Sequence, residues 1–277
     1  MRDLARKTVE FVMLGSLYLV MTIALIYVNA WIVSDLFPYA ATLTMLQMIF
    51  CAISSAGLVY GFKVASVPNR AELRVMSRKF VVLGFFYAVY LWGSNLAYKY
   101  LEVGFIQILK PLGGFMIYLT LLRHGYETLS TWKALNMIAI FGAVSIASCG
   151  QDEIGAFSWV GVSVLLSSLV ANSCYYTLLQ YLLQPQDDDT KQTVRLNPLT
   201  TMLLVGPSAA LWLFCVAVST EWSQKHFEWT LPTWVLLLDC ALAFGLNISI
   251  MYMLKAFSAL TYALCGYGKD VCFRAVL

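Results

Sequence analysis

Charged side chains are scarce in this sequence. Asp, Glu, Lys and Arg make up 12% of its 277 residues, whereas hydrophobic residues make up 60%. Soluble domains contain about 25% charged and roughly 45–50% apolar residues. The composition therefore excludes a soluble cytosolic enzyme, a nucleic-acid-binding domain and a secreted disulfide scaffold. The formal net charge of +3 is too small to indicate a polyanionic partner.

The chain also lacks the motifs of common catalytic and metal sites. It has two histidines, His124 and His226, and no Cys-x-x-Cys pair, P-loop or Gly-x-Ser-x-Gly motif. Its seven cysteines lie almost wholly in apolar stretches, where they are expected to act as small buried hydrophobes. We therefore predict no catalytic residue, no metal and no cofactor, so the protein is not expected to be an enzyme.

Long apolar stretches, in contrast, are abundant. A membrane-spanning helix needs about 20 mostly apolar residues. The first stretch follows a short basic leader and is too long for a signal peptide, so we expect it to be a retained helix. The sequence thus predicts an all-α polytopic membrane protein. The nine stretches lie near residues 11–33, 37–60, 80–98, 103–122, 133–149, 156–183, 197–219, 231–254 and 257–277.

The basic residues alternate between the predicted loops. Thirteen of the 18 Lys and Arg residues precede the first stretch or follow an even-numbered one. The loops after odd-numbered stretches hold only Lys99 and Lys225, together with six acidic residues. Because cytoplasmic loops carry an excess of Lys and Arg, the N-terminus and the even-numbered loops are predicted to be cytosolic. The 13 residues are Arg2, Arg6, Lys7, Lys63, Arg70, Arg74, Arg78, Lys79, Arg123, Lys133, Lys191, Arg195 and Lys255.

Five charged residues lie inside the apolar stretches: Lys110, Asp239, Lys269, Asp270 and Arg274. A charge at the bilayer centre costs at least about 2.5–3.5 kcal/mol, so such residues are candidates for a functional site. Arg274 lies near the end of its stretch, where a long side chain reaches the interface by snorkelling. Lys110 and Lys269 lie too deep for that, and we predict that they bind substrate. Asp239 is either a gating or charge-pairing residue or a satisfied core acid.

Similar polar residues accompany the two lysines, and Gly or Pro residues follow or precede each one. This weak internal symmetry is typical of the two halves of a transporter, whereas tight helix packing through small residues is the structural alternative. We predict that these polar residues help to bind the substrate. They are Asn95, Tyr98 and Gln107 near Lys110, and Asn247, Thr261 and Tyr262 before Lys269.

Three segments resemble motifs of the triose-phosphate translocator and nucleotide-sugar transporter family, within the drug/metabolite transporter superfamily. The resemblance covers nearly the whole chain, in order. The matching segments are Phe37-Pro38-Tyr39 leading into Thr42-Leu43-Thr44, Ser94 to Tyr98 with Val103 to Lys110, and Phe257 to Thr261 with Lys269-Asp270.

This resemblance implies a fold of ten helices in two inverted five-helix repeats and an alternating-access antiporter. Residues 1–150 would form the first repeat and residues 151–277 helices 6–9 of the second. The tenth helix is then missing, and we expect an incomplete sequence. The resemblance also implies that Lys110 and Lys269 bind the substrate phosphate. Because an unpaired buried ammonium is costly, we further predict that Asp270 pairs with Lys269 in the empty site or holds a neighbouring helix.

One departure from the family pattern bears on the substrate. Plastid triose-phosphate translocators follow the ninth-helix lysine with arginine, whereas Asp270 follows Lys269 here. Replacing a second cation by an acid weakens binding of a small, doubly charged phosphate. The Lys-Asp pair resembles the endomembrane branch, which includes nucleotide-sugar carriers.

We therefore predict exchange of a nucleotide sugar for a nucleoside monophosphate across a Golgi or ER membrane, with a homodimer left open. One alternative is plastid-type exchange of phosphorylated sugars or triose phosphate for inorganic phosphate, and another is transport of a different organic anion. A membrane-embedded enzyme and a non-transporting interaction partner are alternatives from other classes.

Overall fold

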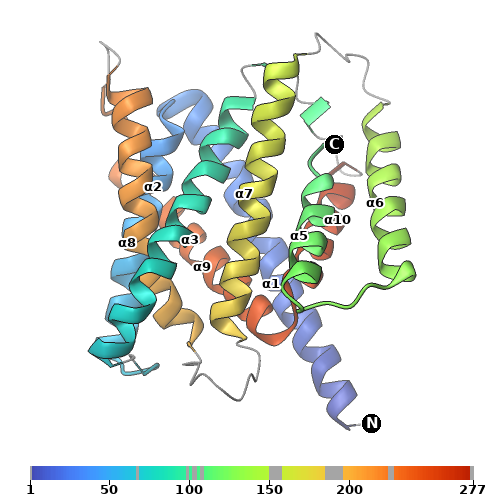
Figure 1. Ribbon diagram of the computed structural model, residues 1–277. Helices are drawn as coiled ribbons and strands as arrows, with labels where there is room; N and C mark the ends of the chain where they lie inside the picture. The colour runs from blue at the N-terminus through green and yellow to red at the C-terminus, as the bar shows by residue number, and fades with distance from the viewer. Residues whose placement is uncertain are drawn as a thin grey trace. The chain divides into compact units, whose positions relative to one another are not determined.

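The computed structural model describes residues 2–66, 69–97, 100–101, 105–106, 109–149, 158–184, 196–223 and 228–274. These residues form nine α-helices, three of which continue into a π-helical turn, and no β-strand (Figure 1). The predicted all-α fold is confirmed. The elements are α1 (Arg2–Trp31) with η1 (Ile32–Leu36), α2 (Ala40–Ala56) with η2 (Gly57–Gly61), α3 (Arg70–Ala97), α5 (Leu112–Arg123), α6 (Thr131–Cys149), α7 (Trp159–Leu183), α8 (Pro198–Ala217) with η3 (Val218–Trp222), α9 (Thr233–Ala256) and α10 (Ala259–Arg274).

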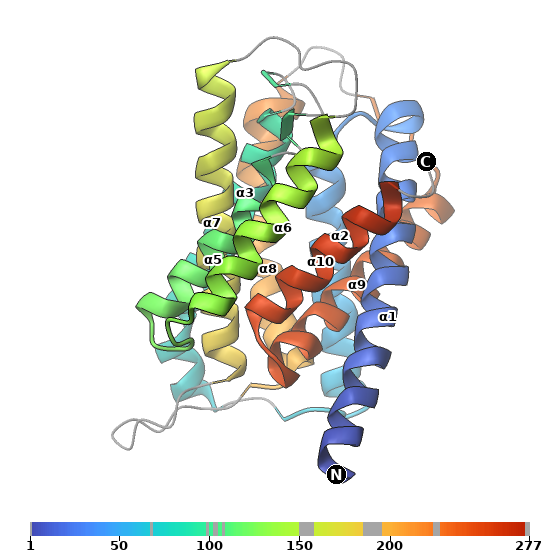
Figure 2. The same ribbon diagram turned by 90° about the vertical axis from the view of Figure 1, so that its right-hand side faces the viewer.

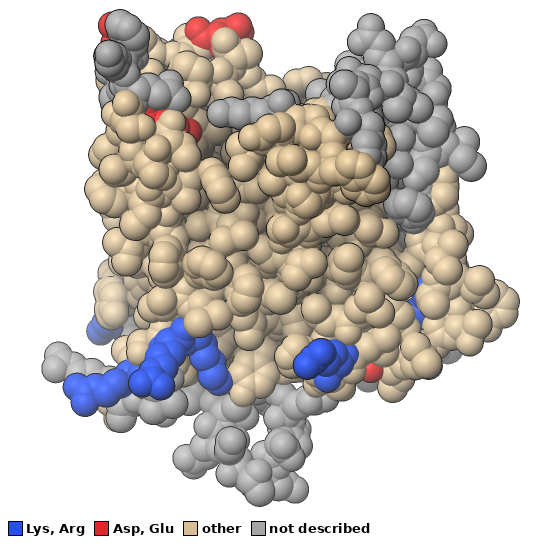
Figure 3. Space-filling model, turned by 45° about the horizontal axis from the view of Figure 1, so that its top comes forward, with Lys and Arg blue, Asp and Glu red and all other residues tan. Residues whose placement is uncertain are grey.

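Within the described residues, six helical segments are long and apolar enough to cross a membrane. Their outer faces carry large apolar side chains, among them Met13, Ile53 and Trp234, each about two-thirds exposed. Uncharged residues also fill most of the molecular face drawn in Figure 3. Such apolar surfaces are suited to contact with lipid. Lipid offers no hydrogen-bond partner to the backbone, and helices satisfy their backbone N–H and C=O groups internally. The chain is thus a multi-pass membrane protein.

The chain folds into two compact units. The first unit comprises residues 1–85 and 179–258, and the second unit comprises residues 86–178 and 259–277. Each unit combines segments from both predicted repeats. The inverted repeats with a boundary near residue 150 therefore stay a prediction, because packing into compact units does not test a symmetry relationship.

The first unit is built around α2 and α8, with α9 in contact with α1, α2 and α8. Gly206 of α8 allows the close approach, because a Cβ there would lie 3.0 Å from the Cβ of Ala52. The start of α8 is encoded locally: the Asn197 side chain accepts a hydrogen bond from the Leu199 amide, and Pro198 occupies the first turn. Both residues are favoured at these positions of a helix.

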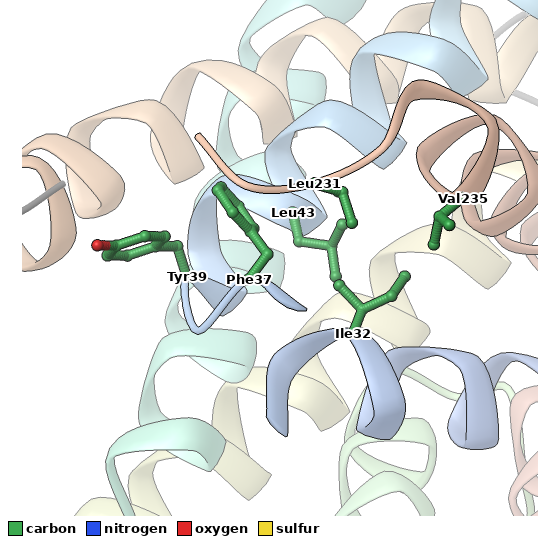
Figure 4. Close-up of a cluster of buried hydrophobic side chains, with 6 residues drawn as sticks. All are labelled: Ile32, Phe37, Tyr39, Leu43, Leu231 and Val235. Atoms are coloured by element: carbon green, nitrogen blue, oxygen red, sulfur yellow. The ribbon is translucent and has the colours of Figure 1, made fainter. Parts of the chain in front are cut away.

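A hydrophobic cluster closes one end of the first unit (Figure 4). It joins the turn after η1 to the start of α9, and Thr230 donates a side-chain hydrogen bond to the Leu36 carbonyl beside it. The Trp229 ring packs on Phe37, with 5.2 Å between centroids. The members of the cluster are Ile32, Phe37, Tyr39, Leu43, Leu231 and Val235.

Within this unit, contacts between loops agree with the predicted alternation of cytosolic and luminal loops. Two loops predicted to be luminal meet at the cluster of Figure 4. Loops predicted to be cytosolic are joined by the Thr200 hydroxyl, which donates to the Ser66 carbonyl at 3.0 Å, and by the Gln184 amide, which donates to the Phe257 carbonyl at 2.9 Å. Loops of one predicted side thus contact each other. Which side faces the cytosol stays a prediction.

The second unit contains the C-terminal part of α3, α5, α6, the first part of α7 and α10. Its described core includes Ala97, Leu101, Ile106 and Leu165, all buried. The Tyr118 hydroxyl fixes the turn between α5 and α6 by accepting a hydrogen bond from the Ser130 amide and donating to the Thr128 carbonyl. Helix α5 contacts both α6 and α10.

Two predicted boundaries were wrong. The basic segment 63–79, between the predicted stretches 37–60 and 80–98, was expected to be a loop, but it is helical from Arg70 onward. Helix α3 thus begins about ten residues before its apolar stretch, in a polar segment. The stretch near 103–122 is interrupted: Phe105, Ile106 and Leu109 are helical, Lys110 and Pro111 form a turn, and α5 begins at Leu112. Lys110 therefore precedes α5 instead of lying inside it. Pro111 explains the second difference: proline lacks the backbone N–H and clashes with the preceding turn, and it is tolerated where a helix starts.

Candidate anion-binding site

The backbone around Lys110 forms a single tight turn that leads into α5. The Lys110 amide donates to the Ile106 carbonyl at 2.9 Å, and the Lys110 carbonyl accepts from the Gly113 amide at 2.9 Å. Pro111 is the N-cap residue of α5. Lys110 itself is half-buried. The turn therefore fixes the point from which the lysine side chain leaves the backbone.

The electrostatics of this turn favour an anion. A helix N-terminus carries a partial positive charge, which favours an anion nearby. At the start of α5 this charge is what counts, because the Gly113 and Gly114 amides already donate to the Lys110 and Pro111 carbonyls. The first turn of α5 contains no acidic residue. Lys110 therefore adds a full positive charge where the helix dipole is already positive. Gly113 lets α5 pack closely on α7, since a Cβ there would lie 3.2 Å from a methyl group of Leu169.

Helix α10 brings the second predicted lysine into the same unit. α10 contacts α5, and the two helices lie beside each other in Figure 1. Thr261 and Tyr262 are half-buried in the first turn of α10. Lys269 and Asp270 belong to the same helix, and their side chains lie outside the described part of the structure.

A group of four tyrosines ties α10 to α7 and α3. The hydroxyls of Tyr176 and Tyr262 lie 2.8 Å apart, and their ring centroids are separated by 4.7 Å. Tyr175 packs on Tyr176 at 5.0 Å and on Tyr87 at 4.9 Å. We refer to these four residues as the tyrosine cluster. It holds Tyr262, a predicted substrate contact, against the buried face of α7.

Sequence reasoning identified Tyr262 but missed Tyr176. The sequence did hold a signal for Tyr176, because a tyrosine buried in a transmembrane helix must find a partner for its hydroxyl. Tyr176 is 7% exposed and makes this contact to Tyr262. The partner itself depends on how α7 and α10 pack, which the sequence pattern does not specify.

The other predicted residues are distributed over both units. Asn95 is exposed on the part of α3 that belongs to the second unit. Tyr98 and Gln107 lie outside the described residues. Asn247 is half-buried on α9, in the first unit, and its side-chain amide donates to the Ala243 carbonyl of its own helix at 2.8 Å.

Asp239 lies in the first unit and is completely buried on α9. Its Oδ2 accepts a hydrogen bond of 2.7 Å from the side-chain amide of Gln47 on α2. The same amide nitrogen lies 3.1 Å from the side-chain oxygen of Asn29 on α1. The partner found for Asp239 is thus a neutral amide. This network of Asp239, Gln47 and Asn29 was not predicted, although polar side chains in apolar stretches are a signal for one.

In the described part of the chain, no three His, Cys, Asp or Glu residues lie together in an arrangement that could hold a metal ion. The charge of Lys110 at the start of α5 instead suits a polar anion. A phosphate group accepts charge-assisted hydrogen bonds from lysine and ordinary ones from hydroxyl donors.

Comparison with known proteins supports this interpretation. No family model matches the chain. Two probable sugar phosphate/phosphate translocators of Arabidopsis thaliana are similar to it. One is 30% identical over 257 residues, which are 92% of this chain and 74% of the relative. The other is 29% identical over 259 residues, with the same shares of the two chains.

These relatives confirm the family resemblance seen in the motifs, but they do not confirm its nucleotide-sugar branch. They are transporters and not enzymes, by their names. The similarity runs through nearly all of the described helices and not through one short motif. The chain therefore belongs to the sugar phosphate/phosphate translocators, in the triose-phosphate translocator family of membrane transporters.

Proposed function

We propose that this protein is an antiporter that exchanges a phosphorylated sugar for inorganic phosphate by alternating access. The observation that carries the proposal is the position of Lys110 at the N-terminus of α5, in the same unit as the helix that bears Lys269. The names of the relatives favour this substrate class over the nucleotide sugar that the Lys-Asp pair predicted.

The proposed chemistry depends on charge neutralisation. Two ammonium groups and a helix N-terminus together compensate a phosphate dianion at a depth where charge is costly. Hydroxyls of Thr261 and Tyr262, at the start of α10, would hydrogen bond the sugar. Without an anion, the site would carry net positive charge through the conformational change, and that step would be slow. At equal pH on both sides of the membrane, exchange would therefore be much faster than one-way transport.

Asp270 has a separate part in this proposal. Neighbouring helical residues point about 100° apart, so Lys269 and Asp270 do not both face one centre. We propose that Asp270 pairs with Lys269 while no anion is bound. Asp270→Asn should then change the substrate affinity or the rate at which the empty carrier returns. Its effect on folding should be smaller.

A second candidate is exchange of a nucleotide sugar for a nucleoside monophosphate. The Lys269-Asp270 pair favours it, because this pair lowers the positive charge available to a small dianion. A Golgi or ER location belongs to this candidate. The relatives favour the first candidate, and one experiment distinguishes the two.

The test is counter-exchange in liposomes that contain the full chain. One set of vesicles is preloaded with inorganic phosphate and the other with a nucleoside monophosphate, and both receive labelled sugar phosphates or labelled nucleotide sugars. Sugar phosphate uptake that requires internal phosphate supports the proposal. Nucleotide-sugar uptake that requires internal nucleoside monophosphate would favour the second candidate. At equal pH inside and outside, uptake independent of the internal anion would reject antiport, and chemically altered label would indicate an enzyme.

A further inference from the structure

Three polar side chains from three helices meet in the interior of the first unit. We call Asn29, Gln47 and Asp239 the buried triad. The Gln47 side-chain nitrogen lies 2.7 Å from Asp239 Oδ2 and 3.1 Å from Asn29 Oδ1. Gln47 is 5% exposed and Asp239 is not exposed at all. Helix α9 contacts both α1 and α2, the helices that carry the other two members of the triad (Figure 2).

The three residues lie at one level of their helices. Asn29 precedes the end of the η1 segment by seven residues, Gln47 follows the start of α2 by seven, and Asp239 follows the start of α9 by six. With a rise of 1.5 Å per residue, each lies roughly 10 Å from the same end of its span. A lipid-embedded protein rarely places a carboxyl group at such a depth without a function.

No Lys or Arg lies near the level of Asp239 in the sequences of the helices packed on α9, because the basic residues of α1, Arg2, Arg6 and Lys7, precede Asn29 by more than twenty residues. Residues 8–62, which include α2 and most of α1, contain no Lys or Arg, and neither does α8. On α9 itself, Lys255 is sixteen residues further on, about 24 Å along the helix. Asp239 Oδ1 has no hydrogen-bond partner among the described residues. An ionised carboxylate here is therefore poorly compensated, and binding of a proton removes the buried charge.

The other ionisable groups near the triad do not supply a positive charge. They are the thiol of Cys240, which interacts with Asp239, and the thiol of Cys51 on α2, which interacts with Cys240. Tyr27 on α1 is half exposed, and Cys215, the one ionisable residue of α8, is exposed. The neutral amide of Gln47 donates equally well to a carboxylate and to the carbonyl oxygen of a carboxylic acid. The triad therefore accommodates both protonation states.

We propose that Asp239 binds a proton from one side of the membrane and releases it to the other during transport, so that a proton gradient drives net substrate movement. The inference goes beyond anion exchange and rests on the proposed transport function. Only a proton moves: it adds to a carboxylate oxygen on one side and leaves the same carboxyl group on the other. In exchange of one anion for another, the carrier returns with an anion bound, and no proton has to cross the membrane.

The wild-type chain gives the first test. Vesicles without internal anion, containing the pH indicator pyranine, receive an external sugar phosphate with and without an imposed pH difference. We expect the pH difference to drive substrate accumulation, with a matching change in internal pH. Active exchange between phosphate-loaded vesicles and medium, without any accumulation or pH change under a gradient, would overturn the proton inference and leave the proposed function intact.

Asp239→Asn gives the second test, because asparagine keeps an oxygen that accepts from Gln47 and cannot carry the proton. This variant should lose gradient-driven accumulation and still exchange internal phosphate for external sugar phosphate at equal pH. The matched control is Asp35→Asn, which alters an exposed acid of the same unit and should keep both activities. Retention of accumulation by Asp239→Asn would overturn the inference. So would loss of both activities at normal membrane abundance, since Asp239 would then serve folding or substrate binding.

The two proposals fail in different ways. A wild-type chain that exchanges none of the tested phosphates would reject the proposed function and this inference together. A chain that exchanges phosphates but shows no dependence on the proton gradient would reject this inference alone.

Discussion

Glu221 accepts hydrogen bonds from both donors of Thr42: its Oε2 lies 2.8 Å from the backbone nitrogen and 2.6 Å from the hydroxyl oxygen. The other carboxylate oxygen lies 2.7 Å from the backbone nitrogen of Ala41. Tyr39, the N-cap residue of α2, supplies no side-chain cap. A carboxylate 179 residues away along the chain thus caps the N-terminus of α2 and joins it to η3.

Removing this cap should destabilise the first unit. We expect Glu221→Ala to lower the free energy of unfolding by about 1–2 kcal/mol, because two backbone donors and the helix dipole lose their acceptor. Thermal unfolding in detergent measures the effect. Glu228→Ala, at an exposed acid in the following segment, is the matched control and should leave Tm nearly unchanged. Equal Tm values for the two variants would show that α2 does not depend on Glu221.

A second prediction concerns the approach of α3 to α8. A Cβ at Gly84 would lie 2.6 Å from the Ser208 hydroxyl oxygen and 2.8 Å from the Ala209 backbone nitrogen. Because backbone atoms cannot move aside cheaply, Gly84→Ala should destabilise the protein by about 1–3 kcal/mol. Gly15→Ala meets no atom within 4 Å and should stabilise α1 by roughly 0.5–1 kcal/mol. Unfolding curves that shift in the same direction for both variants would contradict this packing.

The sequence predicted the membrane class, and each of its nine apolar stretches overlaps one of the nine helices of the described residues. It could do so because an apolar stretch of about 20 residues matches the length that a helix needs to cross the bilayer core. It misplaced the start of α5, since the hydropathy of residues 103–122 hides the effect of Pro111 on the backbone. It also gave no indication that α1, α2 and α8 extend as π-helical turns.

The candidate site was predicted only in part. Lys110 was found because a lysine in an apolar stretch is costly and therefore conspicuous. Its position just before the N-terminus of α5 is evident only from the structure, as is the contact of Tyr176 with Tyr262. Asp239 was noticed for its charge, but its partner Gln47 lies 192 positions away in the sequence, and spacing rules act over a few residues. No feature of the local sequence indicates that two such distant residues are in contact.

The tyrosine cluster gives a third prediction. Tyr176→Phe removes one of two hydroxyls that lie 2.8 Å apart and leaves Tyr262 without this contact. We expect a loss of about 1 kcal/mol in stability, and a similar loss for Tyr262→Phe. The double variant should lose less than the sum, because both single changes remove the same interaction. Tyr252→Phe, on a partly exposed side chain, is the control. Additive losses in this cycle would show that the two hydroxyls do not interact.

The last prediction tests the phosphate site directly. Lys110→Ala and Lys269→Ala should each weaken binding of the sugar phosphate about 10- to 150-fold, the equivalent of a charge-assisted hydrogen bond of roughly 1.5–3 kcal/mol. Exchange at low substrate concentration should fall accordingly, whereas the amount of protein in the membrane should change little. Lys255→Ala removes an exposed lysine from the last turn of α9 and should leave exchange intact.

Arginine substitutions add a test of geometry to this test of charge. Lys110→Arg keeps the positive charge beside the N-terminus of α5 but replaces a compact ammonium by a wide planar group. If charge alone binds the phosphate, this variant should recover most of the affinity lost in Lys110→Ala. If the turn between Ile106 and Gly113 positions a single ammonium, affinity should stay low. Near-normal exchange by the alanine variants of both lysines, at matched abundance, would show that the phosphate is bound elsewhere, even though the family assignment would stand.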